Sequence, residues 1–278
     1  MKKKNKTLAI VTAVLTCTVA VGLYNGLKIQ DYSINTDKIS NNIRIALITD
    51  LHSCKYGNNE IKLIEKIDAQ KPDIILLGGD IFDHKIPDDN TEAFLKGVSG
   101  KYPCYYVTGN HEYRSGEIAF AKKMEILEKY GVVRLSGESV IIEIKGQKLN
   151  ICGIDDPLSL DYSFENTKTY QEQLDNIKGI EENGNYTILL SHRPELMPAY
   201  SEYNFDLVLT GHAHGGQWRI PFVLNGLVAP NQGFFPDYAG GIYEENGTKM
   251  IVSRGLARET TIVPRFYNRP EVVIIDLK

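Results

Sequence analysis

Short apolar runs alternate with segments of helical period from Ile43 to the end of the chain, and this alternation constrains the fold more than any other feature. The runs are rich in Ile, Leu and Val and are short enough to be buried strands. They cover residues 43–49, 74–78, 104–108, 187–190, 207–210, 250–253 and 272–277. Helices are expected at residues 60–69, 91–98, 119–130 and 167–180. The pattern predicts an α/β fold that begins with a βαβαβ unit.

The region after residue 42 is expected to form one domain, residues 43–278, because it contains no repeat, low-complexity tract or linker. A turn at residues 145–147 separates the two strands of a predicted hairpin, 139–144 and 148–153. Residues 215–247 are rich in Gly and Pro and predict an ordered surface loop. The composition, 42% apolar and 24% charged over 278 residues, excludes a disordered or collagen-like chain.

The amino terminus has the pattern of a membrane signal. A basic cluster from Lys2 to Lys6 precedes an apolar run from Leu8 to Leu23, whose only polar members are three threonines and one cysteine. We expect an uncleaved transmembrane helix within residues 1–27, followed by a linker at residues 28–42. A cleaved secretory signal and a buried core helix are the alternatives. With the lysines on the cytoplasmic side, the catalytic domain would be extracytoplasmic at the cell membrane.

The charge of the chain bears on its partners. The net charge is −4, and the first 27 residues contain four lysines and no acidic residue, so the remainder is more negative than the total. General nucleic-acid binding depends on a basic surface. No nucleic-acid partner is therefore expected.

Five polar segments each follow a predicted strand. They are Asp50–His52, Gly79–Asp83, Gly109–Glu112, Ser191–His192 and Gly211–His214. Because ligands bind at the carboxyl ends of the strands in an α/β sheet, we expect the five segments to converge. Polar residues that merely end strands or cap helices would explain any one segment, but they explain the whole set poorly.

The residue types in these segments suit two divalent metal ions, because they offer carboxylate, imidazole and amide ligands without thiolate. The expected ligands are Asp50, His52 and His214 for one ion, Asn110, His192 and His212 for the other, and Asp80 as the bridge. Mn, Fe and Zn all suit such a set of nitrogen and oxygen ligands. The sequence leaves the identity of the metals open.

In this order, the five segments resemble the calcineurin-like metallophosphoesterase superfamily, and the resemblance covers nearly all of residues 43–278. It implies a four-layer αββα sandwich, in which two mixed β-sheets pack face to face between helices. The ligand set above agrees with the family pattern, and no ligand position is substituted. Motifs at residues 214–217, 230–233, 252–256 and 269–271 look like those of the membrane-associated bacterial YkuE/YaeI-like phosphodiesterases.

The implied reaction is hydrolysis of a phosphate ester by a metal-bridged hydroxide that attacks phosphorus. Two divalent ions, two carboxylates and the hydroxide leave an inner shell with a charge of about +1, which attracts an anionic phosphoryl group. The family pattern places His111 beside the leaving oxygen as a proton donor. Asp83 would accept a hydrogen bond from His111, and an ordinary helix cap is its alternative role.

The resemblance favours a phosphodiesterase or pyrophosphatase that acts on a cell-envelope or lipid-linked phosphate ester. A phosphomonoesterase is the close alternative, since the two substrates differ by one charge. A noncatalytic metal-binding envelope protein is a third class, and the intact ligand set argues against it. A metal-dependent amidohydrolase is disfavoured because H-x-H comes late in this chain, at His212–His214.

Residues near the segments receive smaller roles. His84 is expected to be a solvated surface residue. Glu112 and Arg193 are expected to flank the site, and a surface ion pair that contributes little stability is the alternative role for either. The aromatic residues after His214 either pack the loop onto the sheet, which is favoured, or form an apolar wall beside the metals. They are Trp218, Phe222, Phe234, Phe235, Tyr238 and Tyr243.

Overall fold

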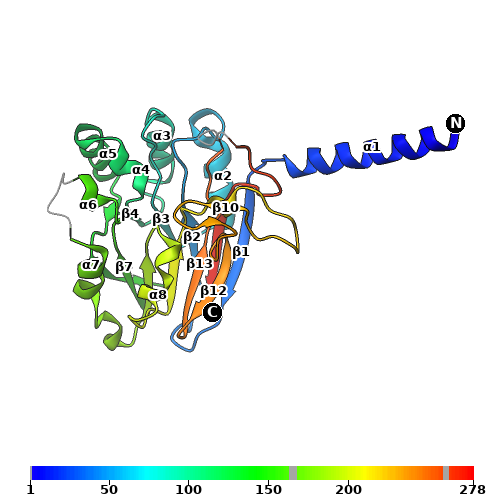
Figure 1. The fold of residues 1–278 in the computed structure, drawn as a ribbon. Helices are drawn as coiled ribbons and strands as arrows, with labels where there is room; N and C mark the ends of the chain where they lie inside the picture. The colour runs from blue at the N-terminus through cyan, green and yellow to red at the C-terminus, as the bar shows by residue number, and fades with distance from the viewer. Residues whose placement is uncertain (1, 163–167, 259–262) are drawn as a thin grey trace.

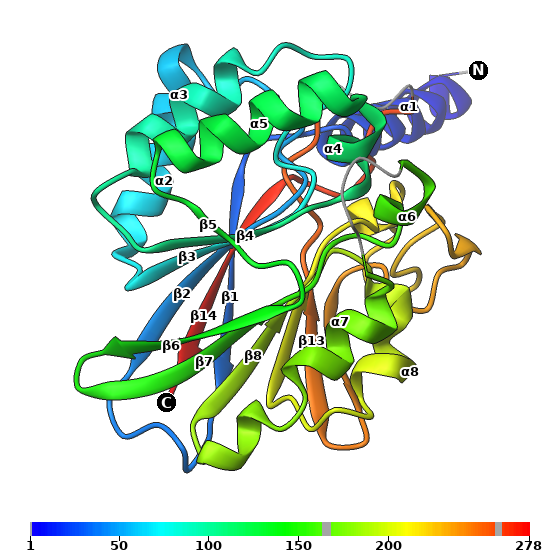
Figure 2. The same cartoon turned by 90° about the vertical axis from the view of Figure 1, so that its left-hand side faces the viewer.

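The computed structural model describes residues 2–162, 168–258 and 263–278 (Figure 1). Two six-stranded β-sheets of mixed direction form the centre of the molecule, and helices cover their outer faces (Figure 2). This arrangement confirms the expected αββα sandwich. The beginning of the helix expected at residues 167–180 lies outside the described residues, and the described part forms α7 (Tyr170–Ile177).

The first sheet has the strand order β1-β14-β2-β3-β4-β5. Its strands are β1 (Lys28–Ile34), β2 (Ile43–Ile48), β3 (Ile74–Gly78), β4 (Cys104–Val107), β5 (Val133–Arg134) and β14 (Glu271–Leu277). Its helices are α2 (Ile61–Gln70), α3 (Asp89–Val98), α4 (Asn110–Arg114) and α5 (Glu117–Lys129). Helix α2 buries Leu63, Ile64 and Ile67 against this sheet, which is the apolar face that its helical period predicts.

The second sheet has the order β12-β13-β9-β8-β7-β6. Its strands are β6 (Glu138–Ile144), β7 (Gln147–Gly153), β8 (Tyr186–Leu190), β9 (Leu207–Thr210), β12 (Gly241–Glu245) and β13 (Thr248–Val252). The predicted hairpin is the antiparallel pair β6–β7. The remaining short elements are α6 (Ser159–Tyr162), α8 (Met197–Tyr200), β10 (Val228–Ala229), β11 (Gly233–Phe234) and 3₁₀ turns at Asn58–Glu60, Ile180–Asn183, Pro194–Leu196 and His214–Gly216.

The main core lies between the two sheets. Ile45 and Leu47 of β2 belong to one buried cluster with Ile188 and Leu190 of β8. Strands β3, β8 and β9 are buried on both faces, one against the other sheet and one against helices, so they read as continuous apolar runs rather than as an alternation. That burial explains why the sequence located these strands well.

The parallel strands bring their carboxyl ends to a common edge of the sandwich. Strands β2, β3 and β4 run parallel in the first sheet, and β7, β8 and β9 run parallel in the second. The two sheets meet there, because a Cβ atom built on Gly79, just after β3, would lie 2.6 Å from the ring of His192, just after β8. This edge carries the candidate site.

Two expectations for the amino terminus are wrong in part. The predicted membrane span is not found, since no helix in the described part of the chain is both long and apolar enough to cross a bilayer. The run from Leu8 to Leu23 is shorter than the about 20 residues of a full span and includes three threonines. It belongs to α1 (Lys2–Gly22), which projects from the domain (Figure 1). Residues 28–34 of the expected linker form β1, which pairs with β14.

Candidate metal centre

The backbone is unusual where the predicted ligands lie. Asp50, His52, Asp80, His212 and His214 all have a left-handed backbone, with φ between +47° and +62°. A left-handed conformation costs a non-glycine residue about 1–3 kcal/mol, so the surrounding packing must hold each of these turns. Each turn redirects the chain as it leaves a strand and points polar side chains into the common edge. Backbone strain of this kind is concentrated at functional sites.

One group of possible metal ligands combines residues of the first and the last of the five polar segments. Asp50, His52 and His214 each offer a donor atom within 4.8 Å of the other two. Nε2 of His214 lies 3.8 Å from Oδ1 of Asp50. All three residues are buried, and Nε2 of His52 has no hydrogen-bond partner among the described residues. A buried nitrogen without a partner is costly unless another group binds it.

A second group consists of Asp80, His192 and His212, again with donor atoms within 4.8 Å of one another. Asp80 lies between the two groups, because its Oδ2 is 3.2 Å from Nε2 of His192 and 3.5 Å from Nε2 of His52. Nε2 of His192 is in turn 4.0 Å from Oδ1 of Asp50. The structure therefore brings six of the seven predicted ligands together around a central carboxylate.

Asn110, the seventh predicted ligand, begins α4 at the same edge. The backbone N–H of the next residue, His111, donates to Oδ1 of Asp80 at 2.7 Å, which fixes Asn110 beside that carboxylate. Asn110 is buried, and its Oδ1 has no hydrogen-bond partner in the described residues. An unpaired amide oxygen and an unpaired imidazole nitrogen at one site fit a pair of divalent ions.

The electrostatics of the site also favour bound cations. Burial opposes the charged form of His192, yet Asp80 and Asp50 raise its pKa to about 10. Burial holds the pKa of His212 and His214 well below the ordinary value, so these imidazoles are neutral, as a metal ligand must be. Burial raises the pKa of Asp50, because a carboxylate without a nearby cation is costly in the interior.

Asp83 holds two histidines rather than one. Its Oδ2 accepts from Nδ1 of His111 at 2.9 Å and from Nδ1 of His52 at 3.1 Å. Burial opposes ionisation of Asp83, but these hydrogen bonds hold its pKa well below the usual range. The carboxylate in turn raises the pKa of His111 against the effect of burial. His84, expected to be a solvated residue, is partly buried, and its ring centroid lies 4.5 Å from that of His111.

Glu112 and Arg193 are not surface residues, so the alternative role in weak surface ion pairs is wrong. Glu112 is fully buried, and its carboxylate accepts the backbone N–H groups of Asp80, Phe82 and Gly109 at 2.8–3.1 Å. Burial and the nearby Asp80 raise the pKa of Glu112 to about 7. Glu112 thus joins the loop after β3 to the loop after β4 and fixes the relative positions of their side chains.

Arg193 forms a buried network that reaches His212. It binds both carboxylate oxygens of Asp156 and donates from Nη1 to Oδ1 of Asn231 at 2.6 Å. That amide oxygen lies 2.8 Å from Nε2 of His212. Because arginine can only donate, it fixes the amide orientation with oxygen toward the histidine. Nη1 of Arg193 also lies 3.1 Å from Nε2 of His212, so Arg193 and Asn231 together hold that side of the ring. Nδ1, on the other side of the ring, lies 3.2 Å from Nε2 of His192.

The sequence reasoning gave no role to Asp156 or Asn231. A signal for Asp156 was present, because Asp155 and Asp156 follow strand β7 and β7 runs parallel to β8. The hairpin interpretation of β7 concealed that its carboxyl end lies at the same edge. Asn231 belongs to the motif at residues 230–233, but the motif does not indicate a role at the site, since the residue lies in the long loop after His214 and reaches the site only through tertiary folding.

An open cavity of about 360 Å³ adjoins the site. His52, His111 and His214 line one part, and Gln217 with Val228, Ala229 and Pro230 lines the rest. The apolar wall is therefore aliphatic, and none of the six aromatic residues considered above lines it. Trp218 packs against Phe266, and Phe222, Phe234 and Phe235 are exposed.

Comparison with known families agrees with this geometry. The family model described as calcineurin-like phosphoesterase matches residues 43–216, which include every predicted ligand. The chain belongs to this family. Members of the family use two divalent metal ions, and the two His/Asp groups that share the Asp80 carboxylate fit such a pair.

Individual relatives of this phosphoesterase are similar over most of its length. An uncharacterized metallophosphoesterase of Campylobacter jejuni is 30% identical over 94% of this chain and 66% of its own. The uncharacterized metallophosphoesterases YkoQ and YkuE of Bacillus subtilis are 29% and 28% identical over 87% and 84% of this chain, and over 89% and 79% of their own. This chain thus spans slightly under two thirds of the Campylobacter relative.

Solved structures show the same fold at low sequence identity. The 5'-nucleotidase precursor from Thermus thermophilus superposes with a TM-score of 0.51 and 13% identity, over 85% of this chain and 54% of that one. The sulfate thiohydrolase SoxB of a Thermus species gives a TM-score of 0.50 with 14% identity, over 84% and 54% of the two chains. At this identity the likeness concerns the fold alone.

Proposed function

We propose that this chain is a binuclear metal-dependent hydrolase of phosphate esters. The observation that carries the proposal is the position of Asp80, whose Oδ2 lies within 3.5 Å of ring nitrogens from both ligand groups. Asp50, His52 and His214 would hold one ion, and Asn110, His192 and His212 the other, with Asp80 bridging both. When bound, the ions supply an activated hydroxide and bind phosphoryl oxygens.

The residues around the ions would fix the ligands and handle the proton of the leaving group. His111 lines the cavity with His52 and His214 and donates its Nδ1–H to Asp83. That bond leaves Nε2 as the atom that can donate to the leaving oxygen, and the raised pKa of His111 favours the protonated ring needed for this step. Asp83 acts as a positioning residue for both His111 and His52.

The substrate proposed is a phosphodiester or pyrophosphate in the cell envelope, with an apolar group next to the phosphate. Val228, Ala229 and Pro230 give the cavity an aliphatic wall opposite its histidines, which suits such a group. A phosphomonoester is the second candidate, because the site offers a net charge of about +1 to either substrate.

We also propose that α1 holds the domain at a membrane surface. Ile10, Val14 and Val21 of α1 are each more than half exposed, and α1 projects from the domain (Figure 1). Lys28, just after α1, pairs with Glu271 at the edge where β2 ends, so α1 leaves the domain beside the metal centre. Such a position would face the site toward lipid.

The decisive experiment is elemental analysis of the purified chain, coupled to turnover of bis(p-nitrophenyl) phosphate and p-nitrophenyl phosphate. We expect two metal ions per chain and faster turnover of the diester. Asp80→Ala should lose metal and activity, whereas the control Asp161→Ala, at an exposed carboxylate, should lose neither. A metal-free, inactive wild-type chain after incubation with Mn, Fe or Zn would reject the proposal. Faster turnover of the monoester would reject the diester preference.

A further inference from the structure

Cationic side chains gather where α1 joins the domain. Burial lowers the pKa of Lys28, and the nearby Arg254, Arg269 and Arg219 lower it further, while Glu271 opposes the shift. Glu271 already accepts from Nε of Arg254 at 2.7 Å. The cations therefore outnumber the carboxylate among them, and this region attracts anions.

Two of these arginines line an open hollow of about 440 Å³. Arg219, Arg254 and Tyr267 form its polar part, and residues 220–225 form the rest. Burial and the nearby Arg254 lower the pKa of Arg219. Nη2 of Arg219 donates to Oδ1 of Asn225, which also lines the hollow. The hollow is thus lined by two guanidinium groups, whose positive charge attracts a phosphate.

The rim of the same hollow carries the most exposed apolar side chains of the domain. Phe222 is fully exposed and Val223 is 80% exposed. The turn that presents them is closed by two hydrogen bonds, from the N–H of Ile220 to the carbonyl of Leu224 at 3.0 Å and in the reverse direction at 2.8 Å. The exposure of Phe222 is therefore fixed by the turn, and a fixed apolar tip of this kind marks an interaction surface.

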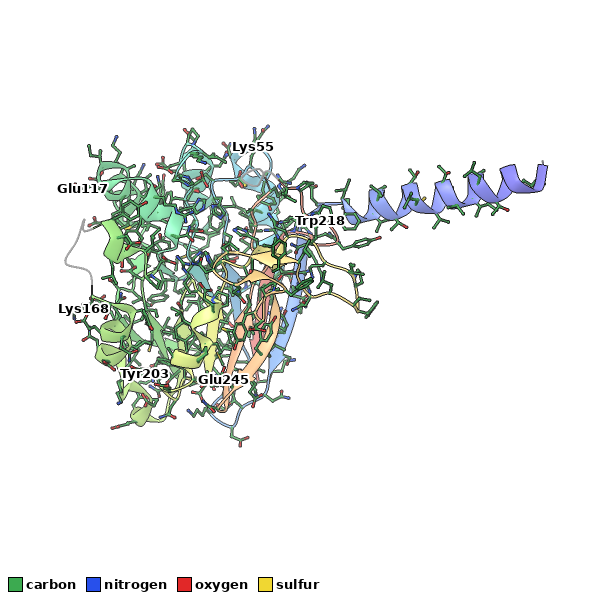
Figure 3. The ribbon with its side chains drawn as sticks, viewed as in Figure 1. Lys55, Glu117, Lys168, Tyr203, Trp218 and Glu245 are labelled. Carbon is green, nitrogen blue, oxygen red and sulfur yellow. The ribbon has the colours of Figure 1, made fainter. Side chains whose placement is uncertain are left out.

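This rim is continuous with the base of α1. The N–H of Tyr267 donates to the carbonyl of Gly22 at 2.7 Å, and its hydroxyl donates to the carbonyl of Thr18 at 3.0 Å. The ring of Phe266 lies beside Gly22 of α1, and its centroid is 5.6 Å from that of Trp218. Figure 3 shows Trp218 beside the point where α1 leaves the domain. The base of α1 and the rim of the hollow therefore lie on the same side of the domain.

We propose that the turn at residues 218–225 and the basic hollow behind it form a docking surface for an anionic lipid bilayer. Phe222 and Val223 enter the acyl layer, while Arg219 and Arg254 bind headgroup phosphate. This surface rests on the proposed membrane association of α1 and adds a second, electrostatic contact that sets the orientation of the domain. Gln217 of the site cavity directly precedes Trp218, so docking places the cavity at the lipid surface.

The test is co-sedimentation of the full chain with phosphatidylcholine vesicles, with and without phosphatidylglycerol. Replacing Phe222 and Val223 together by serine should weaken partitioning about tenfold on both kinds of vesicle. Arg219→Gln should weaken it about fivefold, only where phosphatidylglycerol is present. The controls Ile118→Ser and Lys148→Gln change exposed residues outside the surface and should leave binding unchanged.

Each result separates this surface from the proposed function. If the serine variant and Arg219→Gln both bind vesicles as strongly as the wild type, the docking surface is overturned and α1 remains as the membrane contact. A wild-type chain that binds no vesicle overturns membrane association as a whole. A dimer in solution that the serine variants dissociate overturns lipid as the occupant in favour of a second copy. Turnover of bis(p-nitrophenyl) phosphate should be equal in every variant, so failure of the phosphoesterase proposal is detected independently.

Discussion

The amide oxygen of Asn231 lies 2.8 Å from Nε2 of His212, so a residue of the long loop contacts and orients the ring of a proposed metal ligand. Arg193 fixes the amide by donating to the same oxygen, and Asp156 holds Arg193 through both carboxylate oxygens. The loop after the last strand of the matched family region therefore takes part in the metal centre. Positioning partners of this kind tune the affinity of a metal site.

Asn231→Leu should weaken binding of the second ion about 10- to 100-fold, because His212 loses a polar contact that orients its ring. Metal titration of the metal-depleted chain by calorimetry measures the affinity directly. Asn231→Asp retains an accepting oxygen and should restore most of the affinity. A leucine variant that binds both ions normally would show that Asn231 only packs the loop.

His111→Ala should keep both ions and lose about 10²- to 10⁴-fold in turnover, because a proton donor is removed and no ligand is lost. The loss should be larger for an ester of an alkyl alcohol than for one of p-nitrophenol, since the poorer leaving group needs the proton more. Turnover of the two substrates and elemental analysis check this. Loss of metal from the alanine variant would contradict the separation between ligands and proton donor.

Arg193→Met should destabilise the fold by about 3–5 kcal/mol, because it leaves the buried carboxylate of Asp156 without its partner. Urea unfolding followed by circular dichroism measures the loss. A double variant with Asp156 also replaced by a neutral residue should recover part of it, since no uncompensated charge then remains. Equal stability of the single and double variants would show that the two charges are not coupled.

The ion pair between Arg44 and Asp276 should make stability depend on pH. The hydrogen bond from Arg44 lowers the pKa of Asp276, with Nε lying 2.8 Å from Oδ1. A lowered pKa in the folded state means that the pair stabilises the fold above the unfolded carboxyl pKa of about 4 and is lost as the pH falls below it. Asp276→Asn should cost up to about 1 kcal/mol at neutral pH and almost nothing near pH 2.

Thermal or urea unfolding of both proteins across this pH range checks the sign. A variant whose deficit stays constant from pH 7 to about pH 2 would show that packing, rather than charge, accounts for the effect. Arg44 is partly exposed, so solvent and salt screening reduce the contribution of the pair, and added salt should shrink the difference.

The sequence predicted the sheet strands well and the surroundings of the site less well, for physical reasons. Strands such as Leu207–Thr210 are buried on both faces, so their composition alone reveals them. Strand β1 was missed because its side chains are mostly half-exposed and its partner, β14, is the last strand of the chain. Because β1 and β14 are far apart in the sequence, their pairing leaves no pattern in the residues around β1.

The ligand candidates were predictable because each follows a strand, whereas their supporting residues were not. A surface ion pair was the alternative role for Glu112, since a glutamate beside a loop is usually solvated. Its burial depends on three backbone N–H groups that converge only in the folded chain. Asn231 and Arg193 show the same limit, because their roles depend on contacts between segments that are distant in sequence.

The position of β14 between β1 and β2 has a consequence for synthesis of the protein. The central gap of the first sheet stays open until β14 has left the ribosome, although β2, β3 and β4 emerge much earlier. Until then, β2 exposes an unpaired apolar edge that can associate with other nascent chains. This seven-residue strand completes the sheet, so a product cut short before Glu271 lacks the partner of both β1 and β2.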